Sequence, residues 1–73
     1  MSREYRISWN HNQLRKLNSA VRRYNNAIRR AVRNNPLAEL YLPKEVSYKD
    51  VKASITTARA HKNTVNRLTR ITR

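Results

Sequence analysis

Apolar side chains recur every three or four residues along the first half of the chain, and this stripe constrains the fold more than any other sequence feature. Residues at such intervals share one face of an α-helix. The stripe therefore predicts a long helix over residues 10–34, with Asn10 or Ser8 as its N-terminal cap. Its members, alternately three and four residues apart, are Leu14, Leu17, Val21, Tyr24, Ile28 and Ala31.

Two shorter helices are expected in the second half of the chain. The sequence from Ser47 to Asp50 has the form of a capping box, which makes Ser47 the cap of a helix over residues 47–55. Thr56 and Thr57 are adjacent β-branched residues that disfavour a helix interior, so they separate it from a third helix over residues 58–71. The inner face of that helix is expected to carry Ala58, His61, Val65, Leu68 and Ile71.

The remaining segments are less regular. Residues 1–9 form an arm or a short strand, because Tyr5, Ile7 and Trp9 alternate with polar residues. Residues 37–46 form a connector with a weaker alternation, so a minor two-stranded β element between the two segments is one alternative. Asn34 and Asn35 precede Pro36 and predict a left-handed helix end.

These elements predict one small all-α domain over residues 1–73, in which a long basic helix packs against two short, helix-turn-helix-like helices. The chain has 17 Lys and Arg against 4 Asp and Glu, a net charge of +13. Such self-repulsion favours an anionic partner. Cysteine is absent and the acids are dispersed, so we expect no metal, no cofactor, no catalytic residues and no enzyme activity. No apolar run is long enough to span a membrane, and the moderate apolar stripe is needed for the core, so no membrane partner is expected.

The strongest functional signal is a set of adjacent basic pairs on the long helix. The pairs follow one another at intervals of seven residues: Arg15 with Lys16, Arg22 with Arg23, and Arg29 with Arg30. Seven residues are nearly two helical turns, so the pairs form a ridge that rises about 10.5 Å per pair on the side opposite the apolar stripe. No acid occurs between Glu4 and Glu39 to balance this ridge. An ordinary solvated helix face mixes charges, so the pattern favours phosphate binding.

The third helix carries a looser set of similar groups. Its start combines a threonine hydroxyl, free backbone N–H groups and cationic side chains, which suits a phosphate. The nucleic-acid-binding residues expected there are Thr57, Arg59, Lys62, Asn63, Arg67 and Arg70. The alternative is that the threonines only cap the helix and that the cations are solvated.

The order of these segments resembles a known group of proteins. The segments are Tyr24 to Arg30, Leu42 to Lys52, Ile55 to Arg59, and Asn63. Together they resemble the N-terminal DNA-binding region of tailed-phage proteins of Gram-positive bacteria, such as the terminal proteins of protein-primed phages. The resemblance implies a phage protein that holds double-stranded DNA without strong sequence preference. The priming hydroxyl of terminal proteins belongs to a separate C-terminal domain, so no priming residue is assigned here.

The expected function is therefore a sequence-tolerant DNA-binding module, located in the host cytoplasm or with DNA in the virion. Two alternatives remain open at this point. One is a small phage inhibitor of a host nucleoprotein or defence complex, which would make a host or phage protein complex its partner. The other is a structural RNA-binding protein, since arginine binds the phosphates of either nucleic acid.

Overall fold

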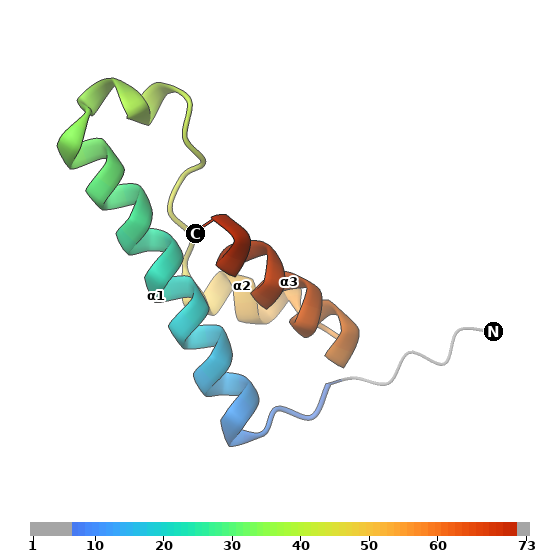
Figure 1. The fold of residues 1–73 in the computed structure, drawn as a ribbon. Helices are drawn as coiled ribbons and strands as arrows, with labels where there is room; N and C mark the ends of the chain where they lie inside the picture. Colours follow the sequence, from blue (N-terminus) through green and yellow to red (C-terminus); the bar gives the residue numbers. More distant parts are fainter. Residues whose placement is uncertain (1–6, 72–73) are drawn as a thin grey trace.

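The computed structural model describes residues 7–71 and shows an all-helical chain within that range. Helix α1 spans His11–Asn34, a short 3-10 helix η1 spans Pro36–Leu40, α2 spans Tyr48–Ser54 and α3 spans Ala58–Ile71. Figure 1 shows α1 as a long rod, with η1 at its far end and with α2 and α3 beside its first half. Helix α1 packs against each of the other three elements and organises the fold. The three predicted helices are therefore confirmed, with ends that shift by one residue at α1 and α2.

The core lies on the predicted stripe of α1. Leu17, Val21 and Tyr24 are buried there, and Ile55 and Leu68 reach them from the α2–α3 link and from α3. Leu17 has no exposed surface at all, and burial of a leucine side chain stabilises the fold by about 2 kcal/mol. This core is thin, as expected for a chain of this length.

Side-chain hydrogen bonds fix the start of α1. The Asn10 side chain accepts a hydrogen bond from the Gln13 backbone N–H at 2.8 Å, and the Gln13 side chain accepts one from the Asn10 N–H at 3.1 Å. This is a complete capping box. Asn10, one of the two predicted caps, is therefore the cap of α1.

The predicted left-handed end of α1 is wrong. Asn35 follows the helix with φ −145° and ψ 96°, which is an extended conformation. No residue in the described range has a positive φ. The ring of Pro36 disfavours helical geometry in the residue before it, and this pushes Asn35 into the extended region. The Asn35 side chain then accepts a hydrogen bond from the Leu37 N–H at 3.2 Å and caps η1.

The minor β element is not present among residues 7–71. The segment around Leu40 lies in η1 and the turn that follows it, where the Leu37, Leu40 and Tyr41 side chains are exposed. The Ile7 N–H instead donates to the carbonyl oxygen of Thr56 at 2.7 Å. Tyr5 and the rest of the predicted arm before Ile7 lie outside the described residues.

Two further expectations need correction. Ser47 precedes α2, but its hydroxyl makes no capping hydrogen bond, so the predicted capping box is wrong. Ala58 is exposed, although it lines a groove together with His61 and Val65, whereas His61 and Leu68 are buried as predicted. Ala58 is the first residue of α3, at the end of the helix.

Candidate nucleic-acid interface

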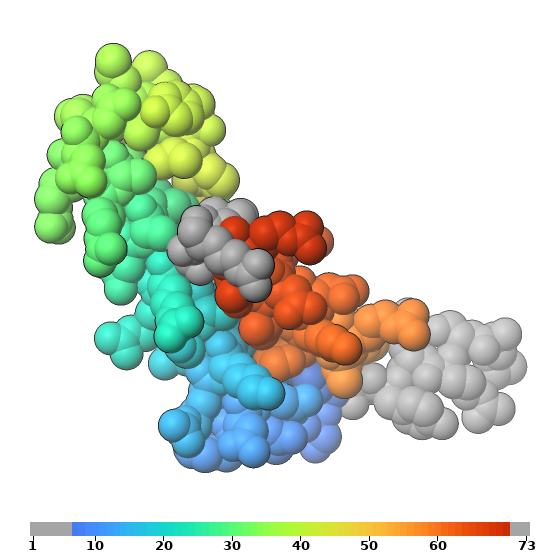
Figure 2. All heavy atoms as spheres, viewed as in Figure 1, coloured from blue at the N-terminus to red at the C-terminus, as the bar shows by residue number. Residues whose placement is uncertain are grey.

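The predicted basic ridge lies on the exposed side of α1 and consists of two rows. The first row is Arg15, Arg22 and Arg29, and the second row is Lys16, Arg23 and Arg30. All six side chains are exposed, because the opposite side of the helix carries the buried stripe. Figure 2 shows long side chains projecting from the edge of α1 that lies away from α3.

The first row meets the connector at its last residue, Arg29. There Arg29 Nε donates to Glu45 Oε1 at 2.8 Å, with 62% and 41% of the two side chains exposed. So exposed a pair stabilises the fold by at most about 1 kcal/mol. The ridge was expected to lack carboxylates, and this contact corrects that expectation at one of its six positions. This contact could not be predicted from the sequence, because Glu45 lies sixteen residues from Arg29.

The connector is fixed beside this row by Asn25. Its side-chain oxygen accepts a hydrogen bond from the Val46 N–H at 2.8 Å, and its side-chain nitrogen donates to the Val46 carbonyl oxygen at 2.7 Å. These two bonds satisfy both polar backbone groups of Val46 at a half-buried position. Asn25 thereby sets where the connector runs and brings Glu45 within reach of Arg29.

The second row borders α3 at its first residue, Lys16. Lys16 from this row and Lys62 from α3 line one groove of about 520 Å³, together with the amide side chains of Asn12 and Asn66. None of the residues lining the groove is acidic. Two ammonium groups and two amides can donate hydrogen bonds to the oxygens of an anion held between the two helices. The structure thus brings together two predicted site residues that are 46 positions apart in the sequence.

The start of α3 is organised by Thr57. Its hydroxyl oxygen accepts a hydrogen bond from the Ala60 N–H at 3.1 Å, so Thr57 caps the helix. Its hydroxyl proton can still be donated to a phosphate oxygen. Arg59, Lys62 and Asn63 are exposed in the first two turns, and no acid lies in the first turn.

The other predicted residues of α3 are less closely associated with this region. Arg67 and Arg70 are exposed on later turns and do not line the groove. Asn12 and Asn66 do line it, and the sequence interpretation did not include them. These two asparagines differ from other surface asparagines only in lying close to Lys16 and Lys62. That proximity depends on how α1 packs against α3, so the sequence alone does not indicate it.

Two other kinds of feature, a metal site and a membrane-spanning helix, are not found among the described residues. Residues 7–71 contain no cluster of His, Asp and Glu side chains that could hold a metal ion. None of the helices in this range is long and apolar enough to cross a membrane. No protein family, curated protein or solved structure matches the chain. The basic rows and the groove are therefore the features from which a function is inferred.

Proposed function

We propose that this chain is a phage-encoded, non-enzymatic module that binds double-stranded DNA through the phosphate backbone, without strong sequence preference. The observation that carries the proposal is the pair of basic rows. They place six exposed cations on one side of a continuous helix, and only Arg29 has a carboxylate partner among the described residues. The positive charges along such a surface repel one another, and bound phosphates relieve that repulsion. The phage origin rests on the resemblance to tailed-phage proteins.

The shape of α1 favours a duplex over a flexible strand. A helix of 24 residues is about 36 Å long, and it presents its cations at fixed spacing along a straight line. A duplex backbone is also rigid, so it can meet several cations without losing further freedom. Small RNA-binding modules usually rely on exposed aromatic side chains to stack on unpaired bases. Tyr24, on α1, is buried, and the exposed Tyr41 lies after η1 rather than in the basic rows.

Helix α3 supplies a second set of phosphate contacts in this proposal. Helix α2 and α3 are joined by three residues, Ile55 to Thr57, as in a helix-turn-helix-like arrangement. We assign α3 to the backbone rather than to base edges, because Arg59, Lys62 and Asn63 surround its capped start. Contacts to phosphate position a protein on DNA but carry no sequence information.

The test is a salt titration on a duplex of random sequence, monitored by fluorescence anisotropy of labelled DNA. If the rows and the start of α3 neutralise ~6 phosphates, log K falls against log salt with a slope of about −5. A slope near zero would contradict the proposal. A double-stranded RNA of the same length is measured in parallel, and tighter binding to RNA would favour the structural RNA-binding alternative. Tight binding to a host protein complex without binding to either duplex would favour the inhibitor.

A further inference from the structure

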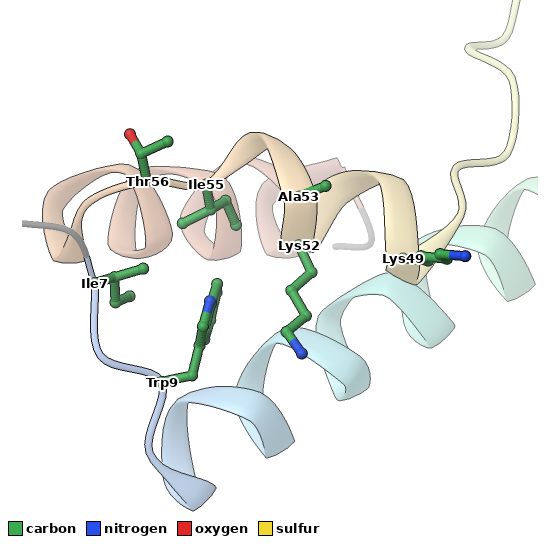
Figure 3. A pocket seen from close by; sticks show the side chains of 7 residues that line it. All are labelled: Ile7, Trp9, Lys49, Lys52, Ala53, Ile55 and Thr56. Carbon is green, nitrogen blue, oxygen red and sulfur yellow. The ribbon is translucent and has the colours of Figure 1, made fainter.

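A pocket of about 520 Å³ lies between the segment before α1 and helix α2, and Trp9 lines it. Trp9 is the single tryptophan of the chain and is half-buried. Figure 3 shows its ring standing between Ile7 and Lys52, with Ile55 facing it from the α2–α3 link. The Lys52 ammonium lies 5.9 Å from the ring centroid.

The walls of the pocket are held in place by the fold. The Ile7 N–H donates to the Thr56 carbonyl at 2.7 Å, and this bond ties the segment that carries Trp9 to the α2–α3 link. Ile55, which forms part of the wall, is only 4% exposed. The Trp9 ring also meets the His61 ring in an edge-on contact, with 5.5 Å between centroids. The ring is thus positioned by three elements before any ligand arrives.

The lining combines an aromatic ring, apolar side chains and two ammonium groups. An indole face and the apolar side chains of Ile7, Ala53 and Ile55 suit a flat, weakly polar ring, and Lys49 and Lys52 suit a phosphate attached to it. None of the lining residues is acidic. The volume falls in the range of small-ligand sites, which runs from about 300 to 1,000 Å³.

We propose that this pocket binds an unpaired nucleotide of a single strand, with its base stacked on Trp9 and its phosphate against Lys49 and Lys52. This inference goes beyond the proposed duplex binding. The base stacks beside the ring where the Lys52 ammonium now lies, and the ammonium moves to the phosphate. His61 lines the groove and touches Trp9, which lines the pocket, so one pair of rings in contact joins the two sites. A strand that leaves the groove unpaired can therefore reach the pocket.

Trp9 fluorescence reports on this pocket directly, because the chain has no other tryptophan. We expect a single-stranded oligonucleotide to quench it. An abasic strand of the same length and charge, and a blunt duplex, should leave it nearly unchanged. Equal quenching by the abasic strand, or no quenching by a single strand that anisotropy shows to be bound, would overturn the proposal. A mononucleotide is tested as a further ligand. If it quenched Trp9 fluorescence at the same concentration as the strand does, the pocket would bind free nucleotides, and the proposal that it binds a nucleotide of a strand would be overturned.

Two matched double variants separate this pocket from the duplex site. Lys49→Gln with Lys52→Gln should raise the concentration of single strand needed for half-maximal quenching about tenfold, and leave blunt-duplex binding unchanged. Lys16→Gln with Lys62→Gln removes the same charge from the groove. This variant should weaken blunt-duplex binding and leave the concentration of single strand needed for half-maximal quenching nearly unchanged. Equal effects of the two variants on quenching would overturn the pocket. Failure of the wild-type protein to bind blunt duplex would contradict the proposed function and leave the quenching result to decide the pocket separately.

Discussion

At the residue scale, the ends of the helices are held by uncharged side chains. Asn10 and Gln13 cap each other at α1, Asn35 caps η1, and Thr57 caps α3. Ser47 has the right residue type and stands at the right position, yet its hydroxyl makes no bond to the helix. A capping motif in the sequence shows that the bond can form, but the local backbone decides whether it does.

Thr57 and Ser47 provide a matched pair of substitutions. Thr57→Ala removes the acceptor of the Ala60 N–H and should lower the free energy of unfolding by about 1 kcal/mol. Ser47→Ala removes no capping bond and should change it by no more than a few tenths of that amount. In so small a domain the first loss corresponds to a fall in the melting temperature of roughly 4–8 °C. Thermal melts followed by circular dichroism measure both, and equal melting temperatures for the two variants would contradict the assigned caps.

At the scale of the elements, what the sequence predicted was local. The stripe on α1 and the Thr56-Thr57 break located the three helices because helix periodicity and capping act over a few residues. The path of the connector could not be predicted, since it depends on Asn25 binding Val46, 21 residues away. The candidate site likewise had a part that was predictable from local sequence and a part that depended on packing. Exposure of the rows followed from the helix period, whereas the groove between Lys16 and Lys62 required the packing of α1 on α3.

The basic rows can be tested as a unit of α1. Arg22→Ala with Arg23→Ala removes one residue from each row near the middle of the helix and should reduce the salt slope by about 2. The loss should be similar on duplexes of unrelated sequence, because phosphate contacts do not distinguish bases. Alanine favours a helix, and both positions are exposed, so circular dichroism should change little.

The matched control for this variant is Lys44→Ala with Lys49→Ala, which removes the same charge from the connector and α2. Both control residues are exposed and lie outside the rows and the groove; Lys49 lines the pocket proposed for an unpaired nucleotide, which a blunt duplex does not supply. We expect a much smaller change in blunt-duplex affinity. If the control weakened binding as much as the row variant, the attraction would depend on total charge rather than on α1.

At the scale of the whole molecule, a thin core carries a net charge of +13. The buried side chains come mainly from α1, with Ile55 and Leu68 closing the core from the other elements. Repulsion among the cations opposes this compact state, and a bound polyanion relieves that repulsion. If the chain binds DNA as proposed, folding and binding are therefore coupled through charge.

This coupling predicts that DNA stabilises the fold. Duplex at a free concentration of one hundred times Kd should add about 2.7 kcal/mol to the free energy of unfolding. In a domain of this size that raises the melting temperature by roughly 10 °C or more. A thermal melt with and without duplex measures the shift, and the Arg22→Ala, Arg23→Ala variant should show a smaller one at the same DNA concentration. An unchanged melting temperature at saturating duplex would show that binding does not select the folded state.

The neutral caps and the Asn25 bonds have a consequence for how this protein can vary. Amides, hydroxyls and apolar side chains provide most of the described contacts that hold the chain together. The exceptions include the exposed Arg29–Glu45 pair and the Lys52 and His61 contacts to Trp9. Shape and charge are therefore nearly independent properties of the molecule. The arginines of the rows can be exchanged for glutamine, in the laboratory or by natural drift, without redesigning the scaffold. The resulting variant would keep the fold but lack the positive charge of the rows, and it would serve as the negative control for any ligand tested on this surface.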